Sequence, residues 1–412
     1  MKHKGVVFSS LFAIPTRNGV YKGTNAHGEG CKIVNMGELF AYDVIVNQDM
    51  KRITMSEDEL LKDGLCKNDL LFARRSLVEE GAGKVSIIGD ITEPMTFESS
   101  IIRVRLDDSK CIPLFYYYWL KSPIGRGAIS ALVTGTNVKG IRASALKDII
   151  VDYPPIIVQQ QTAKVLKEYD DLIENNRKQI KLLEEAAQRL YKEWFVDLRF
   201  PGHEDMQIVD GVPEGWKIVS LDDVISKITT GLNPRKNFVL GKGNNFYVTI
   251  KNMGDNNIYL DDKCDKIDNE ALEKINKRSD LRTGDILFSG IGTMGRVYLI
   301  SIPTNNWNVS ESVFTMRANE RITNEYLYMV LLSDDMKSYC DQNAHGVAQR
   351  GIRMADLRAY KLLLPDDNIL KKYTYISKPL IQKVQALQKQ CKELTEARDR
   401  LLPKLMSGEI EL

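Results

Sequence analysis

The most regular pattern of hydrophobic and polar residues is a seven-residue repeat in two long segments. Within each, apolar positions recur at alternating steps of four and three, and Lys, Glu, Gln and Arg fill most of the other positions. This spacing predicts a helix with one apolar seam, as in a coiled coil. The seam comprises Tyr169, Ile173, Asn176, Ile180, Leu183, Ala187, Leu190 and Trp194, and then Leu380, Val384, Leu387, Cys391, Leu394, Arg398, Leu401 and Leu405.

Pairing of the two segments with each other is the interpretation we favour, because both carry the same seam. Asn176 is the kind of polar seam residue that fixes register at some cost in stability. A helix over about residues 158–196 would be on the order of 55–60 Å long. The alternative is a coiled coil with an unrelated partner.

Short strand-like runs separated by Gly, Asn and Asp turns precede each long helix. We expect strands at residues 69–73, 84–88 and 101–106 in the first half, and at 246–250, 285–289, 296–300 and 313–317 in the second. Helices are expected near residues 114–121 and 324–332, and proline stops at Pro154-Pro155 and Pro365.

The two halves repeat the same short motifs 211 residues apart. Gly140-Ile141-Arg142 reappears as Gly351-Ile352-Arg353, and residues 117–122 resemble residues 328–333. Further upstream the spacing shifts, so that residues 69–72 match 285–288. Between these blocks the halves share almost nothing, which indicates one scaffold carrying two different surfaces.

The expected fold is therefore α+β, with two pseudo-symmetric globular domains separated by two long antiparallel coiled-coil helices. We place the first domain at residues 1–155, a central helical spacer at 156–200, the second domain at 201–366 and a C-terminal helical spacer at 367–412. A chain of 412 residues is too long for one ordinary core, which agrees with more than one domain.

Composition narrows the class of protein. Apolar residues make up 43% and charged residues 27% of the chain, as in soluble globular proteins. No apolar run is long enough to span a membrane, and the short apolar run after Met1 lacks a cleavage site, so we expect a cytoplasmic protein. The six scattered cysteines form no CxxC motif, which favours reduced thiols. The net charge of +2 neither requires nor excludes nucleic acid.

The sequence shows no clear motif for catalysis or for cofactor or metal binding. Gly290-Ile291-Gly292-Thr293-Met294-Gly295 fits GxGxxG, but a strand-like run follows it in place of a helix, so we interpret it as a glycine-rich hairpin. There is no Walker A lysine, HExxH or nucleophile elbow, and the four histidines are not clustered. We therefore expect no catalytic, cofactor-binding or metal-binding residue, and hence a binding or scaffolding subunit.

Loops rich in Arg, Lys, Asn, Gln and His supply the candidates for contact with nucleic acid, because these side chains reach phosphates and base edges. For each candidate residue the other interpretation is structural: a solvated loop in which the side chain caps a helix or forms a salt bridge. The candidates are Arg17, Lys22, Arg74, Arg75, Lys84, Thr136, Asn137, Lys139, Arg142, Arg235, Lys236, Arg296, His345, Gln349, Arg350 and Arg353.

Four segments, in this order, resemble a known family over essentially the whole chain. They are residues 212–217 (VPEGWK) with 220–224 (SLDDV), residues 283–289 (TGDILFS), residues 159–161 (QQQ) through 194–196 (WFV), and residues 401–410 (LLPKLMSGEI). Together with the duplication they resemble the specificity (S) subunit of type I restriction–modification enzymes. The first half lacks a clear counterpart of residues 212–217.

The resemblance implies two target-recognition domains, each reading one half of a bipartite site in double-stranded DNA. It also implies that the helices set the length of unspecified DNA between the two half-sites. The helices would bind two methyltransferase (M) subunits, with restriction (R) subunits in the full complex. S-adenosylmethionine, ATP and Mg are expected on those partners and not on this chain. The family's base-reading residues differ between members, so none is carried over to a position here.

Two other functions are compatible with the sequence. One is the DNA-binding specificity chain of a type II methyltransferase or nuclease system, acting with a separate catalytic chain. The other is a helical scaffold unrelated to DNA. A neighbouring gene for an adenine methyltransferase would argue against the scaffold, and a large ATP-dependent restriction gene beside it would favour the type I assignment.

Overall fold

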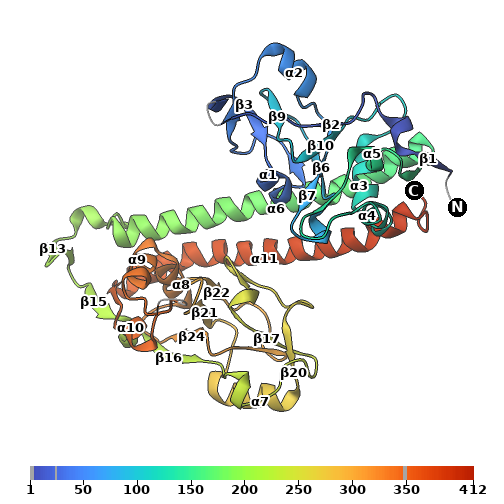
Figure 1. The fold of residues 1–412 in the computed structure, drawn as a ribbon. Helices are drawn as coiled ribbons and strands as arrows, with labels where there is room; N and C mark the ends of the chain where they lie inside the picture. The colour runs from blue at the N-terminus through green and yellow to red at the C-terminus, as the bar shows by residue number, and fades with distance from the viewer. Residues whose placement is uncertain (1–3, 24–25, 347–349) are drawn as a thin grey trace. The chain divides into compact units, whose positions relative to one another are not determined.

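The chain forms two compact units. The computed structural model describes residues 4–23, 26–346 and 350–412 (Figure 1). Unit 1 comprises Met1–Glu174 and Lys392–Leu412, and unit 2 comprises Asn175–Cys391. Each unit contains strands, short helices and one part of each long helix. The expected α+β class, with a duplicated frame and paired long helices, is confirmed.

Unit 1 is built on two sheets. The five-stranded sheet runs in the order β2 (Arg17–Asn18), β10 (Ile101–Val104), β6 (Leu70–Ala73), β8 (Val85–Ile88) and β4 (Val44–Ile45). All its pairs are antiparallel except β4 with β8. A smaller sheet has the order β5 (Arg52–Ile53), β3 (His27–Val34) and β9 (Met95–Phe97), with β3 and β9 parallel.

Apolar helices close the main core of unit 1. Residues 115–120 of α3 (Pro113–Lys121) are all buried, and Ser122 caps the following α4 (Pro123–Ser130) by accepting a hydrogen bond from the Gly125 N–H. The strands β1 (Gly5–Val7) and β12 (Ile150–Asp152) pair antiparallel at the start of the long helix. The remaining helices are α1 (Met36–Ala41), α2 (Glu57–Asp63) and α5 (Ala143–Leu146).

Unit 2 repeats this topology. Its larger sheet has the order β16 (Ile225–Thr230), β24 (Val313–Ala318), β21 (Ile286–Ser289) and β22 (Val297–Leu299). The smaller sheet has the order β20 (Asp265–Ile267), β17 (Asn245–Val248) and β23 (Trp307–Val309), with β17 and β23 parallel.

Unit 2 also contains strands that form two-stranded pairs. These join β15 (Lys217–Ser220) with β25 (Lys361–Leu364), β13 (Ile208–Val209) with β14 (Val212–Pro213), and β18 (Met253–Gly254) with β19 (Asn257–Ile258). The short helices are α7 (Asn269–Ser279), α8 (Asn324–Leu332), α9 (Asp334–Gln342) and α10 (Met354–Ala359).

The same ion pair, between a buried aspartate and a partly buried arginine, holds the larger sheet of each unit. In unit 1 the guanidinium of Arg105 donates from Nε and Nη2 to the carboxylate of Asp69, both at 2.7 Å. In unit 2 Arg317 donates in the same way to Asp285, at 2.6 and 2.8 Å. The bonds to Asp69 and Asp285 raise the pKa of both arginines. Because a carboxylate without its partner is costly inside a protein, each pair fixes how its strands meet.

The two long helices are α6 (Ile156–Tyr191) and α11 (Asp367–Met406), with a π-helical turn at Lys192–Val196 ending the first. In unit 2, Glu184 and Gln188 lie with Ile381 around one cavity, whereas Asn176 contacts Gln390. Residue numbers thus rise along α6 as they fall along α11, so the helices are antiparallel there. In unit 1 the contacts of α6 with α11 run in the same sense.

No residue of the predicted seam is exposed. Those buried are Ile173, Asn176, Ala187, Trp194, Val384, Leu387 and Leu405; those half-buried are Tyr169, Ile180, Leu183, Leu190, Leu380, Cys391, Leu394, Arg398 and Leu401. Leu172 and Leu182, off the seam, are exposed. Asn176 donates from Nδ2 to Oε1 of Gln390 at 3.5 Å, so this polar seam residue is met by an exposed glutamine beside the seam of the other helix.

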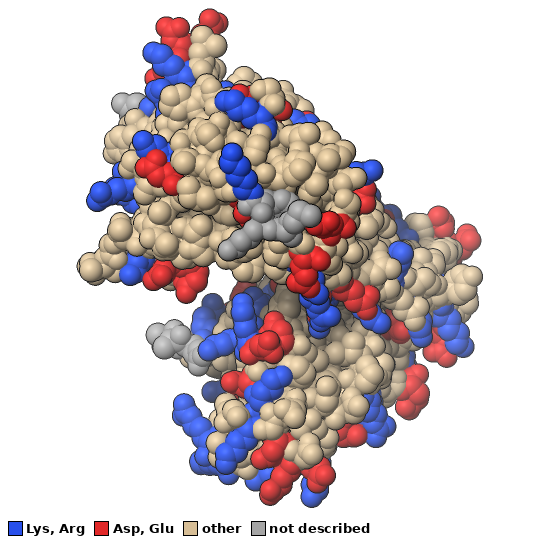
Figure 2. Space-filling view, turned by 90° about the vertical axis from the view of Figure 1, so that its right-hand side faces the viewer, with Lys and Arg blue, Asp and Glu red and all other residues tan. Residues whose placement is uncertain are grey.

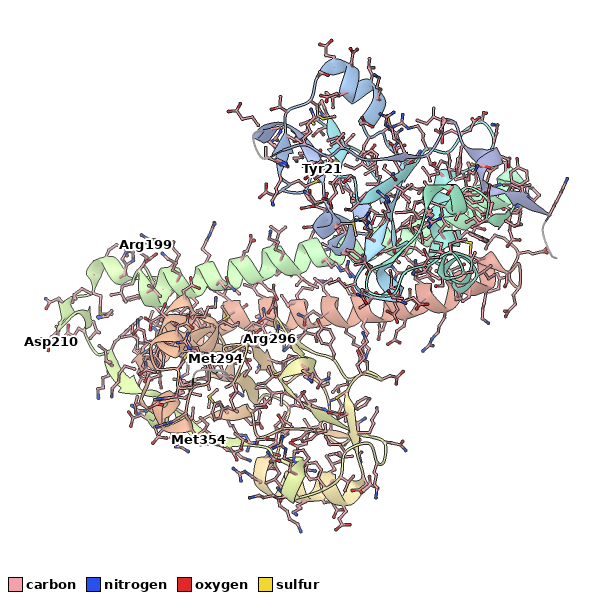
Figure 3. The ribbon with its side chains drawn as sticks, in the orientation of Figure 1. Tyr21, Arg199, Asp210, Met294, Arg296 and Met354 are labelled. Atoms are coloured by element: carbon pink, nitrogen blue, oxygen red, sulfur yellow. The ribbon has the colours of Figure 1, made fainter. Side chains whose placement is uncertain are left out.

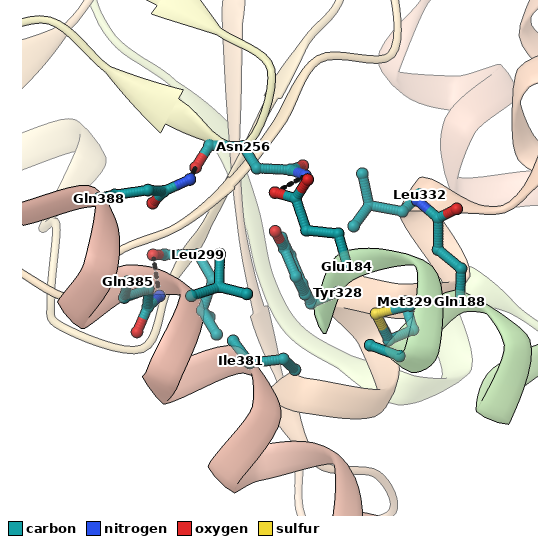
Figure 4. A pocket seen from close by; sticks show the side chains of 12 residues that line it. Glu184, Gln188, Asn256, Leu299, Tyr328, Met329, Leu332, Ile381, Gln385 and Gln388 are labelled. Carbon is teal, nitrogen blue, oxygen red and sulfur yellow. Dashed lines mark hydrogen bonds between the residues drawn. The ribbon is translucent and has the colours of Figure 1, made fainter. Parts of the chain in front are cut away.

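Glutamine and asparagine side chains attach the β18–β19 hairpin and β22 of unit 2 to the helices (Figure 4). Asn256 donates to Oε1 of Glu184 at 2.9 Å, and Gln388 donates to the Asn256 carbonyl at 3.2 Å. Gln385 donates to the carbonyl of Leu299 in β22 at 3.0 Å. These groups and Tyr328 surround a cavity of about 20 Å³, room for one water molecule.

No helix in the described part of the chain is long and apolar enough to cross a membrane.

Candidate nucleic-acid interface

Two loops of unit 1 that carry candidate residues lie side by side. The short strand β7 (Arg75–Ser76) pairs antiparallel with β11 (Lys139–Gly140). The Ile141 N–H donates to the Arg74 carbonyl at 3.1 Å, and Thr134 and Gly140 close the second loop with two bonds of 2.9 Å. The structure therefore joins residues 74–76 to residues 134–142 through main-chain hydrogen bonds.

Unit 2 joins the matching loops in the same way. The Ile352 N–H donates to the Gly290 carbonyl at 2.9 Å, and the Gly292 N–H donates to the Arg350 carbonyl at 2.8 Å. His345 and Gly351 exchange two bonds of 2.8 and 2.9 Å, as Thr134 and Gly140 do in unit 1. The backbone frame of this loop pair is thus duplicated, although the side chains it carries differ.

The basic side chains of the unit 1 pair divide into held and free ones. Arg74 donates to the Ser99 carbonyl at 3.3 Å. Lys84 donates to the Phe40 carbonyl at 2.5 Å, and burial lowers the pKa of its amine. In the described part of the chain, no hydrogen bond or ion pair holds the exposed side chains of Arg75 and Arg142. The other candidates here are Thr136 and Asn137, which are exposed, and Lys139, which is half-buried.

Arg126 on α4 fixes the turn that follows β7, a role that the sequence did not reveal. Its guanidinium donates to the carbonyls of Gly83 and Glu80 at 3.0 Å, and to that of Ala82 at 3.4 Å. Burial lowers the pKa of Arg126. A side chain on Gly83, at φ +68°, would meet Ile129 at 2.3 Å, so glycine is needed there. Nothing in the sequence around an isolated helical arginine indicates these partners.

The GxGxxG segment of unit 2 is a hairpin turn. It connects β21 to β22, which pair antiparallel, and no helix follows it, so the hairpin interpretation is confirmed. Gly292 and Gly295 have φ of +71° and +80°, and a Cβ on either would meet nothing within 4 Å. The backbone of this turn is therefore open to close approach.

Arg296 and Met294 adjoin that turn (Figure 3). Arg296 donates from Nη1 to the carbonyls of Met253, at 2.5 Å, and Ile250, at 3.5 Å. Its position corresponds to that of Lys84, which also binds a main-chain carbonyl. Lys84 therefore holds the last turn of helix α1 in unit 1, and Arg296 holds the segment at residues 250–253 in unit 2.

The second loop of unit 2 carries three described candidates. Nε2 of His345 lies 2.9 Å from Oδ2 of Asp356, and Arg350 donates to the Asp341 carbonyl at 2.7 Å. Arg353 is exposed and precedes α10, and its side chain has no hydrogen bond or ion pair among the described residues; Arg142 precedes α5 in the same way. Gln349 lies outside the described residues.

The four remaining candidates lie near the start of each half. Arg17 on β2 forms an ion pair with Asp63, and Lys22 donates to Glu59 at 2.7 Å and to the Thr54 carbonyl at 2.9 Å. Arg235 and Lys236 are exposed in the 3-10 turn Pro234–Lys236. Among the described residues, no hydrogen bond or ion pair connects these four side chains to the loop pairs.

Charge on the surface is mixed in sign. Lys and Arg lie among Asp and Glu on the face shown in Figure 2, and the described residues there form no broad area of one sign. This agrees with the net charge of +2. On this face, contact with DNA would therefore rest on local basic groups.

The sequence profile of the family described as "Type I restriction modification DNA specificity domain" matches residues 42–185 and 213–396, once in each half. These ranges cover well over half of the chain, and the chain belongs to this family. It is 25% identical over 350 residues to the type I restriction enzyme MjaIX specificity subunit of Methanocaldococcus jannaschii, covering 83% of this chain and 79% of that protein. It is 22% identical over 415 residues to the HindI specificity subunit of Haemophilus influenzae, covering 85% and 88%.

A solved structure has the same fold. It is the type I restriction–modification system S subunit from M. genitalium, with a TM-score of 0.61 and 18% identity, covering 98% of this chain and 95% of that one. The expected resemblance to type I specificity subunits is confirmed by sequence and by fold.

Proposed function

We propose that this chain is the non-catalytic subunit that gives a type I restriction–modification complex its DNA sequence specificity. Each unit reads one half of a bipartite site in double-stranded DNA. The observation that carries this is the duplicated loop pair, in which the same main-chain bonds, Ile141 to Arg74 and Ile352 to Gly290, present different side chains. One frame with two surfaces suits a protein that recognises two different half-sites.

The long helices are the proposed binding region for two methyltransferase (M) subunits, with restriction (R) subunits joining the full complex. S-adenosylmethionine, ATP and Mg bind to those partner subunits and not to this chain, and the complex works in the cytoplasm. Support comes from the family match, which extends into both long helices. The described residues hold no group of three His, Cys, Asp or Glu side chains placed to bind a metal ion.

Exchange of one recognition surface tests whether each unit recognises its half-site independently of the other. Residues 24–145 are replaced with the matching segment of a relative, and genome methylation is mapped in a host that supplies the partner subunits. We expect one half-site of the methylated sequence to change and the other to stay. A simultaneous change of both half-sites would show that the units do not read independently.

A second measurement tests the absence of catalysis. The purified chain is incubated with S-adenosylmethionine, Mg, ATP and duplex DNA. We expect neither methylation nor cleavage until M and R subunits are added, and methyl transfer by the pure chain would refute the assignment.

A further inference from the structure

Large apolar side chains are exposed together on the loop pair of unit 1. Leu77 is 84% exposed, Val78 58% and Val138 50%. The pairing of Ser76 with Lys139 makes Leu77 and Val138 the next residues along the two antiparallel strands. Single exposed apolar residues are ordinary, but three on adjoining loops mark a surface that binds something.

Arg75 adjoins this apolar group. Its backbone lies opposite Gly140 in the β7–β11 pair. Its side chain is exposed and forms no hydrogen bond or ion pair with any described residue. Of the basic residues in its loop, Arg74 and Lys84 are held by the carbonyls of Ser99 and Phe40. Among the described residues, Arg75 is thus the basic residue of its own loop that no side chain or carbonyl holds, and on the facing strand the half-buried Lys139 also has no described partner.

The loop pair is held rigidly before any ligand arrives. Arg126 binds three carbonyls of the turn at residues 80–83. Gly81 is buried, and a Cβ at this position would meet the Ser76 hydroxyl at 2.3 Å. The Val78 N–H donates to the Ser76 hydroxyl at 3.1 Å. A loop fixed in this way loses little conformational entropy on binding.

The local charges favour base edges over phosphates as the target. Glu79 and Glu80 are exposed immediately after Val78, so the two cations of the β7–β11 pair, Arg75 and Lys139, are matched by two carboxylates. Arg142, the further exposed cation of the loop pair, lies beyond that strand pair at the start of α5. A phosphate-binding surface would carry excess positive charge. A two-stranded ribbon fits the major groove, where arginine binds O6 and N7 of guanine and apolar side chains contact the thymine methyl group.

We propose that this ribbon, residues 75–78 with 136–139, enters the major groove of the half-site read by unit 1. Arg75 contacts a guanine, and Leu77 and Val138 contact the methyl group of a thymine beside it. The inference rests on the proposed function and assigns base reading to particular side chains. Unit 2 has Gly290-Ile291-Gly292 where unit 1 has Arg74-Arg75-Ser76, so its half-site is read by other means.

The test maps genome methylation in hosts that express the partner subunits with wild-type chain, Arg75→Ala, Leu77→Ala or a control. Lys67→Ala is the control, because Lys67 is an exposed cation paired with Asp90 outside the loop pair. For Arg75→Ala we expect a guanine in one half-site to lose its requirement, with discrimination at that base falling about ten- to hundred-fold. For Leu77→Ala we expect relaxed choice at an adjacent thymine, and the half-site of unit 2 should stay unchanged.

Several outcomes would overturn the proposal. An unchanged motif with uniformly weaker binding by Arg75→Ala would identify a phosphate contact. Loss of the M subunits from the purified Arg75→Ala complex would identify a surface for a protein partner. An unchanged motif at full affinity would show that the ribbon does not touch DNA. Failure of the proposed function itself is distinguishable, because the wild-type chain would then direct no methylation.

Discussion

Arg398 on α11 donates from Nη1 to Oδ1 of Asp170 on α6 at 2.5 Å, and so binds the two helices together within unit 1. The other carboxylate oxygen accepts a hydrogen bond from the Tyr118 hydroxyl at 2.7 Å, which attaches α3 to the same pair. Burial and the Asp170 carboxylate act in opposite directions on Arg398, and the net result is a raised pKa.

The positions 211 residues away from this trio carry apolar residues in unit 2. Asp170 corresponds to Ile381, Tyr118 to Met329, and Arg398 to Ala187. Ile381, Met329 and Ala187 are buried and line the small cavity of that unit. The two units therefore attach the same helices through different chemistry, ionic in one and apolar in the other.

Stability should reveal this difference. Arg398→Ala leaves the Asp170 carboxylate without its cation and with only the hydrogen bond from Tyr118. We therefore expect a loss of about 1–3 kcal/mol in the free energy of unfolding by urea. The triple variant Tyr118→Met, Asp170→Ile and Arg398→Ala reproduces the residues of unit 2 and should recover most of that loss. A triple variant less stable than Arg398→Ala would show that the apolar solution depends on its surroundings in unit 2.

Glu184 should make the stability of the chain depend on pH. Burial raises the pKa of this carboxyl, opposed by its bond with Asn256. The folded chain therefore keeps a proton that the unfolded chain has lost, so stability falls as pH rises from the usual range of glutamate through the raised pKa. The Glu184→Gln variant cannot titrate at this position. Its free energy of unfolding relative to that of the wild type should therefore increase as the pH rises through this window.

The control for Glu184 is its exposed neighbour, Glu185→Gln. Urea unfolding across the pH series gives the comparison. Parallel pH profiles of the wild type and Glu184→Gln would contradict the prediction, as would an equal effect of Glu185→Gln.

Arg353 and Arg142 should contact the DNA backbone and not bases, because both occupy the same place before a short helix in units that read different sequences. Arg353→Ala should weaken DNA binding by the assembled complex about equally for all sequences. The slope of log affinity against log salt should fall by roughly one. Titration at several salt concentrations measures this, and an altered methylation motif would instead identify a base contact.

The helices are expected to set the gap between the half-sites. Four residues added to both, within residues 173–190 and 384–401, lengthen each by about 6 Å, or roughly two base pairs of DNA. Four residues exceed one turn by about 40°, so the seam should survive with strain. Methylation mapping should report unchanged half-sites and a longer gap. An active variant with the original gap would show that the helices bind partners without measuring distance.

The periodic features of this fold were predictable from the sequence. The expected helix at 324–332 coincides with α8 (Asn324–Leu332), and the strand at 285–289 differs from β21 (Ile286–Ser289) by one residue. Both were marked in the sequence by a continuous apolar run, and all four residues of β21 and residues 326–331 of α8 are buried. The α2 helix was not predicted, although Ser56 and Glu59 form a capping box that marks its start.

The partners of charged side chains were not predictable. Arg74 and Arg75 are neighbours in the sequence with the same chemistry, yet one binds the Ser99 carbonyl and the other is free. Lys84, Arg126 and Arg296 bind carbonyls at least 40 residues away. Such contacts depend on how distant segments meet, which one sequence does not report. The seam residue Arg398 illustrates the same limit, because its partner Asp170 lies on the other helix.

The buried pairs Asp69–Arg105 and Asp285–Arg317 each lie within one unit, so neither carboxylate depends on a residue from the other half of the chain. Genetic recombination between two related genes, with crossovers in the segments that encode the long helices, would carry either pair across intact. A crossover between residues 69 and 105 would combine an aspartate and an arginine from different ancestors. Hybrid genes that inherit a complete half should therefore fold and acquire a new target in one step.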